Sequence, residues 1–281
     1  MKIGVSSYSF AKHIEKTGCD YIEICRIAKE IGFDGIEFID LKPKAGATVI
    51  ETAREIRKYC DEISLEIIAY TVGANLIGEN AEREVEALKR HIDVAHELGA
   101  PLLRHDICRA LPKEHLYTYK DAIAEMVPRI REVTEYAGKF GIRTSSENHG
   151  HVFQAPERVE ELILAVGSDN YGWLCDMGNF LCVDADPVKS VTIASRYVFH
   201  VHAKDFLYKS GEAERPAGFF GTLGGNHLRG TVIGHGVVPV RTCISILKNA
   251  GYDGYVSIEF EGPEEPLGAI KCGYENLKRL I

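Results

Sequence analysis

Apolar and polar positions along the chain follow one recurring pattern, in which a helical stretch ends at a glycine and an apolar run follows within a few residues. Residues 31–38 read IGFDGIEF and residues 250–260 read AGYDGYVSIEF, while 98–105 and 140–147 carry weaker versions of the phrase. Glycine readily adopts the left-handed conformation that commonly ends a helix. The pattern therefore predicts repeated units of a helix, a glycine stop, a short turn and a strand.

Eight strands are expected from this pattern, with helices between them. The strands are predicted near 2–6, 35–39, 65–72, 101–106, 142–149, 172–176, 198–204 and 254–261. The helices are predicted near 20–31, 48–60, 80–98, 119–140, 156–166, 187–196, 239–249 and 265–281. Strands that alternate with helices indicate βαβ units and a parallel sheet.

Eight repeats in 281 residues favour a closed (β/α)8 TIM barrel, an α/β fold that would form a single domain over residues 1–281. A doubly wound open sheet is the alternative, but no G-x-G-x-x-G phrase follows the first strand. Residues 206–237 interrupt the rhythm, because they are rich in glycine and show no clear periodic element. A loop of this length after the seventh strand would lie at the catalytic face, as an active-site lid or as an oligomer contact.

Composition narrows the class of protein. Hydrophobic residues make up 45% of the chain and charged residues 26%, which is typical of a globular domain. The formal net charge is −8 and no Lys/Arg block is present, so the sequence shows no nucleic-acid footprint. The 8 cysteines form no C-x-x-C pair, which favours reduced thiols in a cytoplasmic protein. The opening MKIGVSSYSF indicates a first strand rather than a signal peptide, and no apolar run has membrane-spanning length.

Ionisable side chains stand at the ends of the last four predicted strands, where a plain core would be apolar. They are Glu147 and His149, then Asp176, then His200, His202 and Lys204, and finally Glu259 and Glu261. Because side chains alternate along a strand, the groups from one strand share a face. Barrel active sites are built at these carboxyl ends, so we expect carboxylates and an imidazole to line the barrel mouth.

Three buried carboxylates would repel one another unless a cation neutralised them, so the pattern predicts one divalent metal ion. Oxygen donors with one imidazole suit Mn²⁺ best, with Mg²⁺, Co²⁺ and Zn²⁺ as alternatives. Taken alone, Glu37 is interpreted as a salt-bridged residue of the rim and His200 as a hydrogen-bonded core histidine. Four other histidines are expected at the surface, namely His13, His91, His96 and His115.

Five phrases together resemble the xylose-isomerase-like TIM barrels, also called the sugar phosphate isomerase/epimerase superfamily, over nearly the whole chain. They are GFDGIE, ENHG, CDMGN, HVHAKD and SIEFEG. In ketose epimerases of that group, Glu, Asp, His and Glu on strands five to eight hold one metal. The resemblance maps these ligands to Glu147, Asp176, His202 and Glu259, and it places His200 one layer deeper. Asn179 stands where many relatives have histidine, and Gly234-His235-Gly236 stands where many have a GEG phrase.

The resemblance implies a metal-dependent isomerase or epimerase of a small sugar or polyol ketone. The metal would polarise the carbonyl and stabilise an enediolate, while Glu147 and Glu259 remove and return a proton. The candidates for holding substrate oxygens are His149 and Lys204, and also Arg104 and His105 at the end of the fourth strand, where the inward face is ambiguous.

Other functions stay open at this point. The same enediolate can expel a β-hydroxyl, as in the inosose dehydratases, which are lyases of this superfamily. A non-catalytic sugar-binding barrel would hold no metal and turn nothing over. The apurinic endonuclease branch is disfavoured by the acidic charge and the few ligand histidines. No clear phosphate-binding phrase is present apart from the GTLGGN stretch at 221–226, so an unphosphorylated substrate is preferred.

Overall fold

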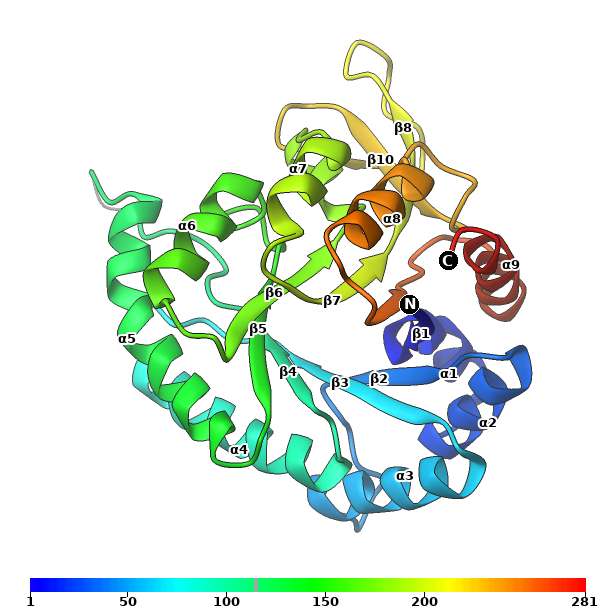
Figure 1. Cartoon of the computed structure of the whole chain (residues 1–281). Helices are drawn as coiled ribbons and strands as arrows, with labels where there is room; N and C mark the ends of the chain where they lie inside the picture. Colours follow the sequence, from blue (N-terminus) through cyan, green and yellow to red (C-terminus); the bar gives the residue numbers. More distant parts are fainter. Residues whose placement is uncertain (114–115) are drawn as a thin grey trace.

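The barrel that the sequence predicts is present in the computed structural model, which describes residues 1–113 and 116–281 (Figure 1). Eight parallel strands close in the order β1-β11-β7-β6-β5-β4-β3-β2. They are β1 (Lys2–Ser6), β2 (Gly35–Ile39), β3 (Glu66–Val72), β4 (Leu102–His105), β5 (Arg143–Glu147), β6 (Tyr171–Asp176), β7 (Val198–Ala203) and β11 (Tyr255–Ile258). The single-domain (β/α)8 TIM barrel is therefore confirmed.

Helices surround the barrel between successive strands. They are α2 (Tyr21–Ile31), α3 (Val49–Ile63), α4 (Ala81–Leu98), α5 (Tyr119–Gly138), α6 (Pro156–Val166), α7 (Pro187–Ala194), α8 (Val240–Asn249) and α9 (Pro266–Lys278). The glycine stops behave as predicted, because Gly32 and Gly99 end α2 and α4 with left-handed backbone. Three short helices were not predicted: η1 (Ser7–Phe10), α1 (Ala11–Thr17) and η2 (Asn179–Val183).

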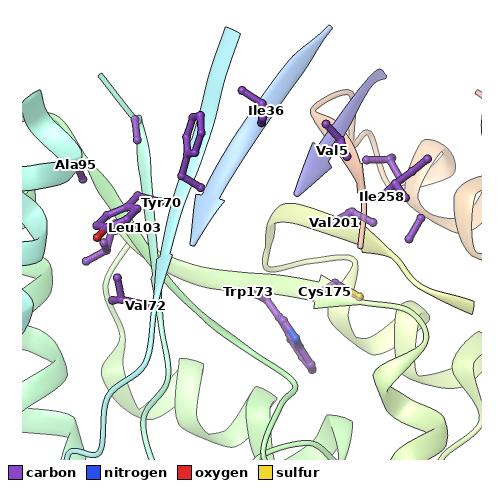
Figure 2. Close-up of a cluster of buried hydrophobic side chains, with 14 of the residues drawn as sticks. Val5, Ile36, Tyr70, Val72, Ala95, Leu103, Trp173, Cys175, Val201 and Ile258 are labelled. Carbon is purple, nitrogen blue, oxygen red and sulfur yellow. The ribbon is translucent and has the colours of Figure 1, made fainter. Parts of the chain in front are cut away.

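The strands are buried on both faces, and the two faces differ in chemistry. Apolar side chains such as Val201 and Ile258 pack with the helices in one continuous core, part of which Figure 2 shows. Polar side chains at the alternate positions, such as His202, are equally buried but point toward the barrel axis. The alternation thus gives the barrel an apolar outer layer and a polar interior near its mouth.

Residues 206–237 contain regular structure that the sequence pattern did not predict. They form a small antiparallel sheet in the order β8-β10-β9, from β8 (Asp205–Lys209), β9 (Phe220–Gly221) and β10 (His227–Thr231). We call residues 205–238 the arm, and Figure 1 shows it, mostly in yellow, extending away from the barrel. Its strands are short and only partly buried, so they lack the alternation that reveals a strand in sequence.

Two carboxylates hold the arm in place. Asp205 accepts hydrogen bonds from the backbone N–H groups of four residues, namely Phe206, Gly234, Gly236 and Val238. Asp184 accepts from the Thr222 hydroxyl and the Asn226 amide, both at 2.8 Å, and from the Gly224 N–H. The GTLGGN stretch is therefore already bound to a carboxylate, which opposes its use as a phosphate-binding loop. Within the described residues, no helix is long and apolar enough to cross a membrane.

Candidate metal and active site

Four side chains from the last four barrel strands converge at the barrel mouth. Glu147, Asp176, His202 and Glu259 each offer one ligand atom, and these atoms all lie within 4.8 Å of one another. His202 Nδ1 lies 3.9 Å from Glu147 Oε1, 4.0 Å from Asp176 Oδ2 and 3.5 Å from Glu259 Oε2. The strand register places Asp176 beside His202, so the convergence follows from the parallel pairing of β6 with β7.

The chemistry of this group fits a divalent cation. Asp176 and His202 are fully buried, and within the described chain Asp176 Oδ2 and His202 Nδ1 make no hydrogen bond. Buried polar atoms without a partner are rare in proteins and call for a ligand. Three carboxylates with one imidazole can hold Mn²⁺, Mg²⁺, Co²⁺ or Zn²⁺. The residues that the sequence singled out as ligands are thus brought together in a suitable set.

The electrostatics of the group also favour positive charge. Burial, with help from the neighbouring carboxylates of Glu147 and Glu259, raises the pKa of Asp176 to about 6. Burial would raise the pKa of Glu259 as well, but Lys204 and His202 hold it well below its ordinary value. Lys204 Nζ lies 2.6 Å from Glu259 Oε2 and 3.2 Å from Asp176 Oδ2. Lys204 and His202 therefore favour the ionised form of Glu259, whereas burial opposes the ionisation of Asp176 until a cation binds.

Arg104 and His149 lie on the β4 and β5 side of the same mouth. The buried Arg104 guanidinium places Nη2 2.9 Å from Glu147 Oε2 and 2.6 Å from Asp106 Oδ1. His149 Nδ1 lies 3.0 Å from the same Asp106 oxygen. Burial opposes the charge on Asp106, but Arg104 and His149 lower its pKa to about 2. Asp106 thus links the two predicted substrate-binding residues, a role that the sequence pattern did not reveal.

Several of these side chains, Glu147 and Glu259 among them, line a cavity of about 250 Å³. Its lining comprises Tyr8, Ile39, Asp40, Thr71, Val72, Gly73, Arg104, Glu147, His149, Lys204, Glu259 and Glu261. Both proposed proton-transfer residues, Glu147 and Glu259, therefore face the same cavity. Tyr8, in η1, and Asp40, directly after β2, complete the lining, and they had no distinguishing signal in the sequence.

His105 does not belong with the substrate-binding candidates. Because Arg104 points inward, its neighbour points toward the helices, where the buried His105 ring lies 6.3 Å from the Tyr171 ring. His105 Nδ1 is 2.9 Å from the Asp106 carbonyl oxygen. The described residues that line the cavity do not include it. The sequence left open which residues of β4 point toward the barrel axis, and the contacts of Arg104 show that Arg104 does.

Glu37 was interpreted as a rim residue, and that interpretation is wrong. The side chain is fully buried inside the barrel, between His200 Nε2 at 2.6 Å and His202 Nε2 at 2.7 Å. The expected surface histidines also differ among themselves. His96 is exposed, whereas His13 and His91 are half-buried, and His115 lies outside the described residues.

Comparisons with known proteins give the family. A family model described as the xylose isomerase-like TIM barrel matches residues 25–280. The chain belongs to the xylose isomerase-like TIM barrel family. Among curated relatives, the rhizopine catabolism protein MocC of Rhizobium meliloti is 24% identical over 268 residues, covering 90% of this chain and 79% of that protein. An inosose dehydratase of Lacticaseibacillus casei is 22% identical over 243 residues, covering 82% of this chain and 78% of the relative.

Solved structures of the xylose isomerase-like family share the fold along nearly the whole chain. A xylose isomerase-like TIM barrel protein from Mycobacterium smegmatis in complex with magnesium has a TM-score of 0.73 and 20% identity, covering 99% of this chain and 96% of that one. The IOLI protein with a bound zinc atom has a TM-score of 0.77 and 16% identity, covering 100% and 98%. Members of this fold thus occur with either metal.

Asn179 joins two residues of the candidate site in this xylose isomerase-like barrel. Asn179 Nδ2 donates to Glu147 Oε1 at 2.8 Å, and Asn179 Oδ1 accepts from Lys204 Nζ at 3.1 Å. The amide therefore bridges the carboxylate of one candidate ligand and the buried ammonium group.

Lowering the pH is expected to destabilise this barrel partly through His105. Burial lowers the pKa of His105 to about 4, so between pH 6.5 and 4 the unfolded chain binds the proton and the folded chain does not. Stability that is present at pH 7 is lost as the pH falls through this window, by about 2 kcal/mol at pH 5. Urea unfolding at both pH values should show a smaller loss in His105→Gln than in the parent. Equal losses would contradict the assignment, and the exposed His96→Gln is the control.

Proposed function

We propose that this chain is a metal-dependent enzyme that transfers a proton at the carbon next to the ketone carbonyl of a small sugar or polyol, as an isomerase or epimerase. The observation that carries the proposal is that two carboxylates of the candidate ligand group, Glu147 and Glu259, face one cavity. When bound, the divalent ion would polarise the carbonyl and stabilise the negative charge of the enediolate.

A cationic side chain lies beside each of the two carboxylates that are proposed to transfer the proton. Arg104 keeps Glu147 paired with a cation, and Lys204 does the same for Glu259. An ionised carboxylate beside the substrate can accept the proton next to the carbonyl, and the other group can return one. Either carboxylate can act as the base, with the other as the acid. His149 and Lys204 line the cavity and are proposed to hold substrate oxygens.

An uncharged polyol ketone suits the cavity better than a phosphorylated sugar. The two buried cations of the lining, Arg104 and Lys204, are already paired with carboxylates. The GTLGGN stretch is held by Asp184, as described above. The name of the relative inosose dehydratase also supports a polyol ketone as substrate.

Dehydration of such a ketone is the second candidate, because relatives are inosose dehydratases, which are lyases. The first step, proton removal next to the carbonyl, is the same in both reactions. The proton that the carboxylate removed would then pass to the β-hydroxyl, which leaves as water, and the Lys204 ammonium in the cavity wall would stabilise the departing oxygen. The two candidates differ in product: an epimer or isomer in the first reaction, and loss of water in the second.

The test is incubation of the Mn²⁺-loaded protein with ketoses and inososes in deuterated water. We expect deuterium to enter the carbon next to the carbonyl, as followed by NMR, and the product spectrum to separate isomerisation from dehydration. Protein treated with a chelator is the control and should show no exchange. A protein that binds no Mn²⁺ and exchanges no substrate of the panel would instead support a non-catalytic sugar-binding barrel.

A further inference from the structure

We propose that Glu37 is a positioning residue that fixes the His202 ring so that Nδ1, rather than Nε2, is the metal-binding atom. The inference rests on the proposed metal site, and it concerns residues of β2 and β7 that lie beneath that site. Glu37 belongs to the GFDGIEF phrase, and His202 belongs to FHVHAKD. The candidate ligand set itself does not require Glu37.

The geometry around Glu37 is that of one carboxylate shared by two imidazoles. Glu37 Oε1 lies 2.7 Å from His202 Nε2, and Glu37 Oε2 lies 2.6 Å from His200 Nε2. The two rings are 5.5 Å apart and nearly perpendicular, at 83°. All three side chains are buried, with Glu37 and His202 at 0% exposure. Each carboxylate oxygen therefore has its own imidazole nitrogen.

This arrangement selects one tautomer of His202. A buried carboxylate needs N–H donors, and the Nε2 atoms of the two histidines are the nitrogens at its oxygens. A neutral imidazole that carries its proton on Nε2 presents a lone pair at Nδ1. In this structure Nδ1 is the atom that faces Glu147, Asp176 and Glu259. Metal-binding histidines commonly donate their other N–H to a carboxylate, which fixes both the ring and its tautomer.

His200 explains why the strand carries two histidines on one face. β2 and β7 are not neighbours, because β1 and β11 stand between them in the barrel. The contact from Glu37 to His202 therefore crosses the barrel interior rather than following a strand ladder. His200 occupies the second carboxylate oxygen and so limits rotation of the carboxylate. This contact orients the Glu37 carboxylate, on β2, toward His202 across the barrel interior.

A second metal ion among Glu37, His200 and His202 Nε2 is the competing explanation, since these atoms also form a group of metal-type ligands. The distances oppose it. Ligand atoms at about 2.0–2.2 Å from one ion, at angles of 90° or more, are separated by about 2.8 Å or more. Glu37 Oε2 accepts a hydrogen bond from His200 Nε2 at 2.6 Å, and His202 Nε2 lies 2.7 Å from Glu37 Oε1, which is closer than two ligand atoms of one ion would be. Glu37 therefore binds the histidines directly.

The experiment is calorimetric titration of metal-free protein with Mn²⁺, for the parent and for Glu37→Gln. We expect one ion per parent chain and an affinity about 10- to 100-fold weaker in Glu37→Gln, because a glutamine has only one acceptor oxygen for two N–H groups. His200→Gln should weaken binding less, since Glu37 still contacts His202. Thr134→Val, which changes a buried hydroxyl on α5, is the matched control and should bind as the parent does.

A second readout needs no variant. In Zn²⁺-loaded parent protein, long-range ¹H–¹⁵N NMR of the histidines should show His202 protonated at Nε2 and bound through Nδ1, which a merely structural role for Glu37 would not require. Binding through Nε2, or equal Mn²⁺ affinity of parent and Glu37→Gln, would overturn the inference and leave the proposed function intact. Two ions per parent chain, with one lost in Glu37→Gln, would also overturn it. A parent that binds no Mn²⁺ would defeat the proposed metal site itself.

Discussion

Glu259→Gln is expected to slow deuterium exchange at the substrate carbon by about 10²–10⁴-fold, the usual contribution of a positioned acid or base. The substitution removes a carboxylate from the candidate ligand group and leaves Lys204 Nζ without the partner that now lies at 2.6 Å. The Mn²⁺ affinity should fall in the same variant. Exchange is followed by NMR in deuterated water, and bound Mn²⁺ is measured on the purified protein.

Glu261→Gln is the matched control for this prediction. Glu261 Oε2 also lies near Lys204 Nζ, at 3.5 Å, and lines the same cavity, but Glu261 is not in the four-residue ligand group. The Glu261→Gln variant should therefore bind Mn²⁺ and keep most of the parent's rate of deuterium exchange. Glu147→Gln should resemble Glu259→Gln. Exchange that persists at the parent rate in Glu147→Gln would remove this residue from the proton-transfer pair.

Asp205→Ala is expected to lower the free energy of unfolding by about 3 to 4 kcal/mol, because four backbone N–H groups lose one acceptor together. Asp205 is 1% exposed, and its bonds to Gly234, Gly236 and Val238 tie the end of the arm to its beginning, two residues after β7. Hydrogen bonds to a charged acceptor are stronger than neutral ones, and buried donors left without a partner add their own cost. Urea unfolding of parent and variant measures the difference.

Two variants test whether the loss of stability depends on the burial of Asp205 or follows from removing any carboxylate that binds the arm. Asp205→Asn keeps one acceptor oxygen and should lose less stability than Asp205→Ala. Asp184→Ala removes the exposed carboxylate that holds the 222–226 turn, and we expect a loss of about 1 kcal/mol or less, because water can replace an exposed acceptor. Equal losses in Asp184→Ala and Asp205→Ala would show that the burial of Asp205 is not what matters.

Sequence patterns predicted those parts of the barrel that depend only on residues close to one another in the chain. The glycine stops predicted where the strands begin, because a residue in the left-handed conformation commonly ends a helix and the strand follows within a few residues. Alternation along β7 placed His200 and His202 on one face, and the structure has them there. The carboxyl ends of parallel strands meet at one end of a barrel, so Glu147, Asp176 and Glu259 could be expected together.

The remaining features depend on contacts between distant parts of the chain. Glu37 and His200 are 163 residues apart and meet only because the barrel closes. The same applies to Asp106, which becomes a link between Arg104 and His149 only once β4 and β5 end side by side. The arm was not predicted because its strands are short: only Phe206 and Leu228 pack in a small buried cluster with Cys182, and the carboxylates of Asp205 and Asp184 hold its backbone.

The sequence by itself determined the barrel strands, the helices between them and most residues that point toward the barrel axis, because these follow from local periodicity and side-chain parity. The family was indicated by the resemblance of five phrases. Only the tertiary structure decided which inward residues touch. It showed that the lone glutamate of β2 lies beneath His202, that His105 faces the helices and that Asn179 bridges Glu147 and Lys204. Distances across a closed barrel depend on all eight strands at once, and no local pattern contains them.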